Sequence, residues 1–191
     1  MDAVALPPQS AGQATLGEMI AEARGLLEQA GIESAGQEAF WIVEHVLRLP
    51  VHHMVTDRER LLSSVELAAA RGLVKRRVGR EPLQYILGTQ EFCGLEFHVN
   101  PAVLIPRPET ELLVEYVAQR IASEQQATIV DVCTGSGCIA VAIARKRPHA
   151  RVFATDLSNP SLTVARQNAV YHAVGERITW LEGDLLGALA G

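Results

Sequence analysis

Residues 128–181 alternate between short strand-like runs and longer helix-like runs, and this order restricts the fold more than any other feature of the sequence. Three short runs rich in β-branched and apolar residues are typical of buried strands: 128–132, 151–155 and 178–181. Helical spacing predicts helices between them, over 139–145 and 160–173. A β-α-β-α-β order predicts a parallel sheet with right-handed crossovers, as in doubly wound α/β folds.

The first third of the chain favours a small bundle of helices. Three Ser or Thr residues each stand three positions before a Glu or Gln and ahead of apolar residues at helical spacing, the pattern of a capping box. The boxes pair Thr15 with Glu18, Ser34 with Gln37, and Ser63 with Glu66. Gly31 and Pro50 should end the first two helices. We expect Phe40 and Trp41 to lie in the core of this bundle rather than to form a platform for a ligand.

After residue 82 the hydrophobic period changes. Leu95, Phe97 and Val99 alternate with polar residues, which is typical of a half-buried strand. We interpret residues 84–99 as a β-hairpin, followed by a helix from about residue 109 to 122. The hairpin would link the helical N-terminal part to the α/β part of the chain.

Composition and charge exclude several classes of protein. The 191 residues carry a net charge of −5 and are 48% hydrophobic, which suits a packed core and not a general grip on nucleic-acid phosphates. The one basic cluster is interpreted as the solvated face of a helix, and it comprises Arg71, Lys75, Arg76, Arg77 and Arg80. No apolar run is long enough for a membrane span, and residues 1–13 read as a frayed leader without the features of a signal peptide.

The cysteines and histidines predict neither a disulfide framework nor a metal site. Cys93, Cys133 and Cys138 lack zinc-ligand spacing. His52 and His53 are adjacent, so they cannot share one helical face as a ligand pair. Cysteines of this kind fit a reducing cytoplasm.

A glycine-containing turn at residues 131–137 carries the most chemical information, because there a strand runs into the start of a helix. Glycine lets the backbone approach a ligand closely. Gly135, Gly137 and Ala140 fit the relaxed G-x-G-x-x-A pattern of dinucleotide sites, with Asp156 about 20 residues further on, where a ribose-binding acid belongs. This spacing alone is compatible with a nicotinamide cofactor.

Asp131 favours a different cofactor, S-adenosylmethionine. A carboxylate directly before the turn would oppose a pyrophosphate but suits the ammonium and sulfonium groups of S-adenosylmethionine. Asp156 would then hold the ribose hydroxyls, and Asp184, after the third strand, could reach the adenine amino group. The alternative interpretation is that these acids only cap the helices that follow them.

Three motifs resemble those of the release-factor glutamine N5-methyltransferases, and the resemblance extends over the whole chain. The motifs are Glu81-Pro82-Leu83-Gln84-Tyr85-Ile86-Leu87-Gly88, Leu104-Ile105-Pro106-Arg107-Pro108-Glu109-Thr110-Glu111, and Asp131-Val132-Cys133-Thr134-Gly135-Ser136-Gly137-Cys138-Ile139-Ala140. The second motif is specific, whereas a glycine-containing turn by itself is not.

The resemblance implies a three-part chain: a helical substrate-binding domain at 1–80, a β-hairpin linker at 81–105, and the first half of a Rossmann-like methyltransferase domain at 106–191. It implies methyl transfer from S-adenosylmethionine to the glutamine side-chain amide nitrogen in the Gly-Gly-Gln motif of peptide chain release factors. Pro106 and Arg107 should lie near the cofactor. The residues expected to bind it are Asp131, Cys133, Thr134, Gly135, Ser136, Gly137, Asp156, Asp184 and Leu185.

The sequence departs from the family pattern in two respects. Cys133 stands where the family usually has glycine, so its side chain could crowd the cofactor or forbid a positive φ. The Asn-Pro-Pro-Tyr motif, which positions the substrate amide, is absent, so no catalytic residue is assigned and we expect residues 1–191 alone to be incomplete for catalysis. Without the strand that carries this motif, we also expect an exposed sheet edge and poor solubility or dependence on a partner.

Two other functions remain open at this point. A nicotinamide-dependent oxidoreductase would use the G-x-G-x-x-A spacing. A non-catalytic module would use the helices and the hairpin only to bind a release factor. For the methyltransferase interpretation, the expected partner is the release factor, and we expect no metal ion, no membrane and no direct nucleic-acid partner.

Overall fold

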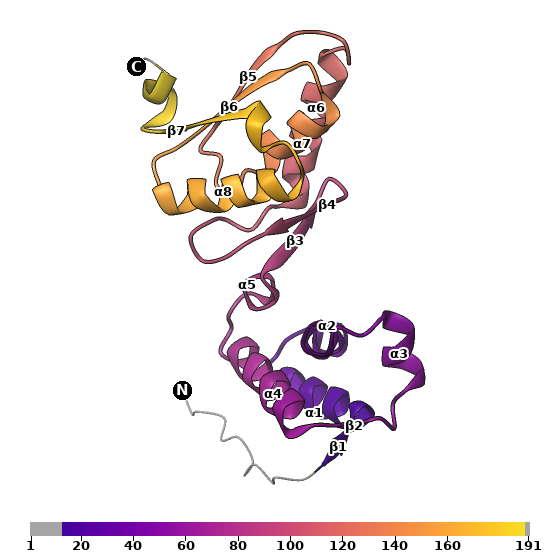
Figure 1. The fold of residues 1–191 in the computed structure, drawn as a ribbon. Coiled ribbons are helices and arrows are strands. Elements are labelled where there is room, and N and C mark those ends of the chain that lie inside the picture. Colours follow the sequence, from indigo (N-terminus) through magenta and orange to yellow (C-terminus); the bar gives the residue numbers. More distant parts are fainter. Residues whose placement is uncertain (1–12, 190–191) are drawn as a thin grey trace. The chain divides into compact units, whose positions relative to one another are not determined.

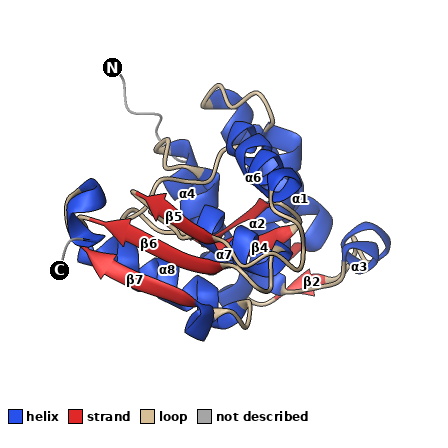
Figure 2. Ribbon diagram, turned by 90° about the horizontal axis from the view of Figure 1, so that it is seen from above, coloured by secondary structure: helices blue, strands red, loops and turns tan. Residues whose placement is uncertain are grey.

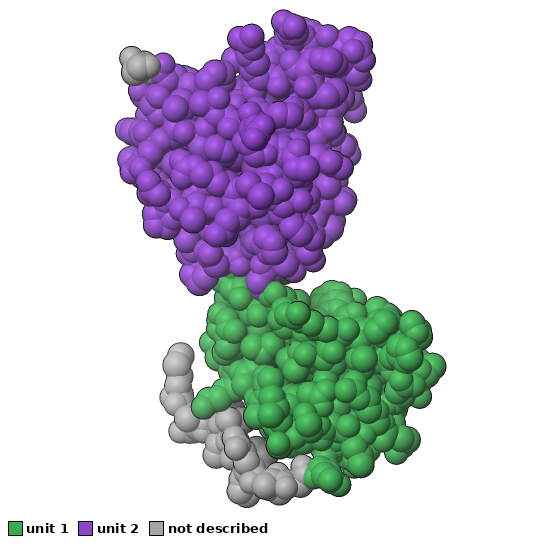
Figure 3. Space-filling model, in the orientation of Figure 1, with its two compact units in different colours: residues 1–87 green, residues 88–191 purple. Residues whose placement is uncertain are grey.

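The computed structural model describes residues 13–189, so most of the predicted leader lies outside the described residues. The chain forms two compact units, residues 1–87 and 88–191 (Figure 3). In residues 13–189, no helix is both long and apolar enough to cross a bilayer.

Unit 1 is a helical bundle with a minimal sheet. Its helices are α1 (Leu16–Gln29), α2 (Ala35–Leu47), α3 (Val51–Thr56), α4 (Ser64–Val78) and α5 (Leu83–Leu87). Two short strands, β1 (Ala14–Thr15) and β2 (Leu61–Leu62), pair antiparallel. The predicted bundle is therefore confirmed.

Two of the three predicted capping boxes are present. Thr15 and Ser63 each accept a hydrogen bond from the backbone three residues on, and the Glu at that position bonds back to the cap. The prediction for Ser34 is wrong: this residue precedes α2, but its side chain makes no capping bond. Its backbone (φ −89°, ψ 26°) is outside the extended region in which an N-cap hydroxyl reaches the free N–H groups.

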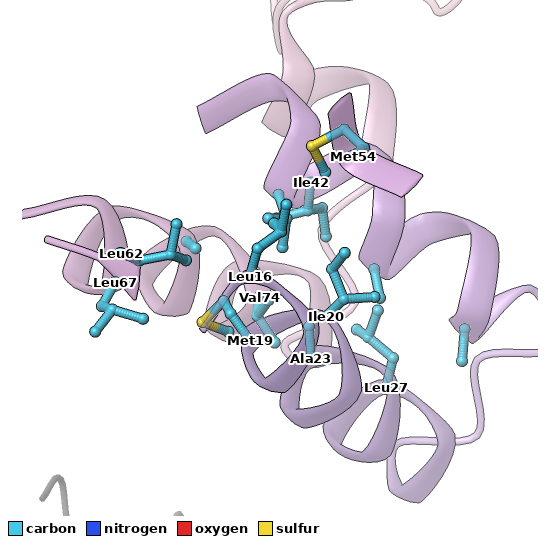
Figure 4. Close-up of a cluster of buried hydrophobic side chains, with 14 of the residues drawn as sticks. Leu16, Met19, Ile20, Ala23, Leu27, Ile42, Met54, Leu62, Leu67 and Val74 are labelled. Carbon is cyan, nitrogen blue, oxygen red and sulfur yellow. The ribbon is translucent and has the colours of Figure 1, made fainter. Parts of the chain in front are cut away.

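The core of unit 1 lies between α1, α2 and α4 (Figure 4). Leu16, Met19 and Leu27 on one face of α1 are fully buried, as is Ile42 of α2. Trp41 does not lie in this core as predicted, because its side chain is 40% exposed. The neighbouring Phe40 is half-buried and packs against the core, as predicted.

The arginines of the basic cluster on α4 are held within unit 1. Arg71 forms an ion pair with Glu22, Arg76 with Glu81, and Arg77 with Glu38. Arg80 donates to backbone carbonyls at the end of α1. These contacts occupy the guanidinium groups that a phosphate site would need.

Unit 2 contains a hairpin and a three-stranded parallel sheet (Figures 1 and 2). Its elements in chain order are β3 (Thr89–Phe92), β4 (Leu95–His98), α6 (Pro108–Arg120), β5 (Thr128–Val132), α7 (Cys138–Lys146), β6 (Arg151–Asp156), α8 (Asn159–Tyr171), η1 (Gly175–Arg177), β7 (Ile178–Glu182) and η2 (Leu185–Leu189). The sheet has the order β5-β6-β7. The predicted α/β fold with a parallel, Rossmann-like sheet is confirmed.

The hairpin is shorter than predicted. Residues 83–87 form α5 instead, because Pro82 opens a helical turn whose carbonyl accepts from the N–H groups of Tyr85 and Ile86. Within the hairpin, Phe92 and Phe97 are fully buried and belong to the core of unit 2. The hairpin thus contributes its apolar face to the same core as α7 and β6.

Candidate functional site

The carboxyl ends of β5 and β6 lie side by side and present two acids to one turn. In the parallel register Asp131 pairs with Ala154 and Val132 with Thr155. The backbone N–H of Thr134 donates to the carbonyl of Thr155 at 2.9 Å and fastens the turn to β6. Ligands of doubly wound folds bind at this edge of the sheet.

Asp131 lies at the base of the turn, with only 6% of its surface exposed. One carboxylate oxygen, Oδ2, accepts from the Thr134 hydroxyl at 2.6 Å and from the Ala140 N–H at 3.2 Å. Burial raises the pKa of Asp131, and the negative charge of Asp156 raises it further, while the two hydrogen bonds act in the opposite direction. A positively charged group bound here would stabilise the ionised carboxylate.

Asp156 holds the turn from the neighbouring strand. Its Oδ2 accepts from the N–H of Gly135 and its Oδ1 from the N–H of Ser158, both at 2.9 Å. One carboxylate therefore joins the glycine turn to the start of α8.

The two glycines of the turn are required for different reasons. Gly135 has φ +56°, and a Cβ added to it would meet open space, so its backbone is accessible to a ligand. Gly137 has φ +78°, and an added Cβ would lie 2.9 Å from the Cβ of Ala165. Gly137 thus permits the close packing of α7 against α8.

Cys133 adopts the left-handed conformation that its family position predicts for glycine. Its φ is +60° and the residue is exposed. The expectation that cysteine could forbid a positive φ here is therefore wrong. The conformation is still strained by about 1–2 kcal/mol, because the residue is not glycine. Cys138, at the start of α7, is buried, and burial raises the pKa of its thiol to about 11.

Asn168 supports the site and was not identified from the sequence. Its side-chain amide donates to the carbonyls of Ser136 and His98, and its oxygen accepts from the N–H of His98. The residue is fully buried. One side chain of α8 thereby connects the glycine turn to β4. An amide among mainly apolar residues on the buried face of α8 was the only sequence signal.

Two of the remaining expected residues, Asp184 and Leu185, follow β7. Asp184 is exposed, and the preceding residue, Gly183, donates its N–H to the carbonyl of Asp156. The carbonyl of Leu185 accepts from the Thr155 hydroxyl at 3.2 Å.

Four further residues were expected to lie near the cofactor: Pro106 and Arg107 before α6, and Thr134 and Ser136 in the turn. Pro106 is buried, while Arg107 is exposed at the N-cap of α6. For the residues that the structure describes, no hydrogen bond joins the Arg107 side chain to the turn. Thr134 and Ser136 are both buried. Within residues 13–189, no group of three or more His, Cys, Asp or Glu side chains is arranged to hold a metal ion.

Two family models match the chain in succession. Residues 18–88 match the PrmC N-terminal domain, and residues 108–190 match the methyltransferase small domain. The matches cover most of unit 1 and the helix and sheet part of unit 2.

Several curated proteins are similar over most of this chain. The release factor glutamine methyltransferase of Geobacter sulfurreducens is 45% identical over 175 residues, which cover 92% of this chain and 60% of that protein. The release factor glutamine methyltransferase of Moorella thermoacetica is 40% identical over 177 residues, covering 93% of this chain and 62% of that protein. A bifunctional methyltransferase of Rickettsia prowazekii is 33% identical over 184 residues, which cover 87% of this chain and 36% of that protein.

The chain therefore spans about three fifths of the length of the first two relatives. The resemblance noted in the motifs at 81–88, 104–111 and 131–140 is confirmed by both domain matches and by these identities. The chain thus contains a PrmC N-terminal domain followed by a methyltransferase small domain, and over most of its length it is similar to release factor glutamine methyltransferases.

Proposed function

We propose that the turn between β5 and α7 holds S-adenosylmethionine, in a methyltransferase that modifies the glutamine side-chain amide of the Gly-Gly-Gln motif in peptide chain release factors. The observation that carries the proposal is the pair of carboxylates, Asp131 and Asp156, at one glycine turn. The methyltransferase small domain and the similarity to release factor glutamine methyltransferases support the same reaction.

The charge of the turn supports a cationic ligand over a pyrophosphate. Asp131 is buried and its pKa is raised in part by Asp156, so a further negative group here would increase the repulsion. The sulfonium and ammonium groups of S-adenosylmethionine would reduce it. The nicotinamide alternative relies on G-x-G-x-x-A spacing, but the N–H of Gly135 already donates to Asp156.

The residues around the turn suit separate parts of the cofactor. We assign Asp131 to its amino-acid end and Asp156 to its ribose hydroxyls, with Gly135 allowing close approach of the backbone. Further residues proposed to border it are Cys133, Thr134, Ser136, Gly137, Asp184, Leu185, Pro106 and Arg107. When bound, the cofactor would supply the electrophilic methyl group.

The substrate assignment rests on the relatives. Their name specifies release factor glutamine methylation. Unit 1, which matches the PrmC N-terminal domain, is proposed to help bind that protein. The three cysteines, none of which is in a disulfide, suit a reducing compartment such as the cytoplasm.

Calorimetry of the 191-residue chain with S-adenosylmethionine and, separately, with NADH tests the cofactor. The proposal expects binding of the first and no heat from the second. Binding of NADH alone would instead support the oxidoreductase.

Transfer of a labelled methyl group to a release factor tests the reaction, with a Gly-Gly-Ala variant of that factor as control. Label in the Gly-Gly-Gln protein only is the expected result. A chain that binds both the cofactor and the release factor without transferring label would favour the non-catalytic module.

A further inference from the structure

A groove of about 830 Å³ lies on the outer face of α8, within unit 2. Its lining consists of His98 from β4 and Thr163, Arg166, Gln167, Val170 and Tyr171 from α8. The five α8 residues follow one another at helical spacing and so form a single stripe. The opposite face of α8 carries the buried Leu162, Ala165 and Ala169 and packs into unit 2.

The wall of the groove is held in place by contacts beneath and beside it. Asn168 bonds both backbone polar groups of His98 and fixes β4 against α8. The His98 ring lies edge-to-face with Tyr171, with ring centres 5.0 Å apart. The Tyr171 hydroxyl reaches Glu96 at 3.4 Å, and a ring nitrogen of His172 bonds the Glu96 carbonyl at 2.7 Å. The groove is thus a formed surface feature.

The two ends of the stripe differ in chemistry. Thr163, Arg166 and Gln167 make the first end polar and cationic, while Val170 and Tyr171 make the second apolar. Val170 is 73% exposed and Tyr171 is 56% exposed, a large solvent exposure for apolar side chains on adjacent positions.

Arg166 is available for an external partner. It is exposed, and its guanidinium group makes no hydrogen bond or ion pair with any of residues 13–189. In unit 1, by contrast, Arg71, Arg76 and Arg77 are each paired with a glutamate. None of the six lining residues is acidic, and Glu96 stands beside Tyr171 at the apolar end.

We propose that this α8 groove docks a segment of the protein substrate in which an acidic side chain is followed by an apolar one. The carboxylate would pair with Arg166 and Gln167, and the apolar side chain would cover Val170 and Tyr171. The pair Arg166 and Gln167 and the pair Val170 and Tyr171 are four residues apart on α8, which is about one helical turn, or about 6 Å along the axis. The proposal rests on the proposed function, because it takes a release factor as the substrate.

Charge complementarity selects this partner over nucleic acid. A chain with net charge −5 repels acidic molecules on the whole, so an acidic segment needs a local unpaired cation. One arginine is too little positive charge to hold a phosphate backbone. The exposed apolar end requires a partner that also offers an apolar side chain.

Binding of a release factor to three variants of the chain tests the groove: Arg166→Glu, Val170→Asp and, as a matched charge control, Arg151→Glu. Arg151 is exposed at the amino end of β6, and its side chain makes no hydrogen bond or ion pair with the residues that the structure describes. We expect Arg166→Glu and Val170→Asp each to weaken binding at least tenfold and Arg151→Glu to change it less than twofold. Unchanged S-adenosylmethionine affinity in all three would show that unit 2 keeps its fold.

Release-factor binding by Arg166→Glu equal to wild type would overturn the docking proposal alone. If Arg166→Glu lost binding of a single-stranded RNA 12-mer but kept release-factor binding, the docking proposal would be overturned in favour of a nucleic-acid site. Failure of the wild-type chain to bind a release factor at all would overturn the proposed substrate as well, so the two failures are distinguishable.

Discussion

At the scale of single residues, the carboxylate of Asp131 has opposite effects on the stability of the empty protein and on the binding of a cationic ligand. Its carboxylate is buried at the end of β5, where ionisation is unfavourable without a cation nearby. The same negative charge is what suits a cationic ligand. A site of this kind is expected to lower the stability of the empty protein.

The variant Asp131→Asn should therefore become more stable relative to the wild type as the pH rises. Because the folded pKa of Asp131 is raised above its ordinary value of 3.8, the folded state keeps the proton longer than the unfolded chain. Wild-type stability then falls as pH rises from the unfolded pKa through the folded one, and stays lower above it. Asparagine cannot titrate. Urea unfolding at pH 4 and pH 7 should show a difference between variant and wild type that grows in favour of the variant; a constant difference would contradict this.

A second residue-scale prediction concerns Cys133 and its positive φ of 60°. Cys133→Gly should raise the free energy of unfolding by about 0.5–1 kcal/mol, the relief of left-handed strain less the greater freedom of glycine in the unfolded chain. Cys133→Ala, which keeps a Cβ, is the control and should bring no such gain. Equal stability of the Gly and Ala variants in urea would show that the position is unstrained.

Some site residues could be predicted from the sequence because their signal is local. Asp131, Gly135 and Asp156 stand at strand ends and in a turn that the sequence pattern locates. Asn168 could not be found in this way, because its partners His98 and Ser136 are 70 and 32 residues away. Trp41 was misplaced for a related reason, since which face of α2 is buried depends on α1 and α4.

At the scale of elements, the packing of α7 on α8 depends on Gly137. Gly137→Ala should destabilise the protein by about 2–4 kcal/mol, from the strain of its φ of +78° and from a Cβ 2.9 Å from that of Ala165. Gly135→Ala is the matched control, because it has a positive φ but open space, and should cost about 1 kcal/mol. Equal losses in urea unfolding would mean that the helix contact is not tight.

Between residues 108 and 182, the predicted helices and strands of unit 2 agree with the structure within one or two residues, because the hydrophobic period is clear there. The strand at 128–132 is found as predicted, and α8 begins one residue before the expected position. The exception is the hairpin of unit 2, which was predicted to start at residue 84, whereas β3 starts at Thr89 because residues 83–87 form α5 of unit 1. The five residues of α5 are too few to show a helical period. Its helical turn depends on the backbone bonds to Pro82, which a hydrophobic pattern does not reveal.

At the scale of the whole molecule, the two units have separate hydrophobic cores. One core consists of residues between 16 and 83, and the other of residues between 92 and 178. Each unit also contains one of the two tryptophans, Trp41 on α2 and Trp180 on β7. Fluorescence can therefore follow the two units individually.

The variant Ile42→Ala should destabilise unit 1 alone. Ile42 is fully buried, so the loss should be about 2–5 kcal/mol. In a Trp180→Phe background, Trp41 fluorescence should report a transition at lower urea. In a Trp41→Phe background, Trp180 fluorescence should report an unfolding transition at the same urea concentration with and without Ile42→Ala. A common shift of both transitions would show that the two units unfold together.

The central claim, that acids at the ends of β5 and β6 hold S-adenosylmethionine, is tested most directly by calorimetry of wild type, Asp156→Ala and Asp57→Ala. Asp57 is a control of equal charge change in unit 1, where it is bonded to His53. Loss of hydrogen bonds from a charged acceptor costs about 1.5–3 kcal/mol, so Asp156→Ala should weaken binding roughly 10- to 150-fold. Asp57→Ala should bind as wild type does. Equal affinity of Asp156→Ala and wild type would contradict the account.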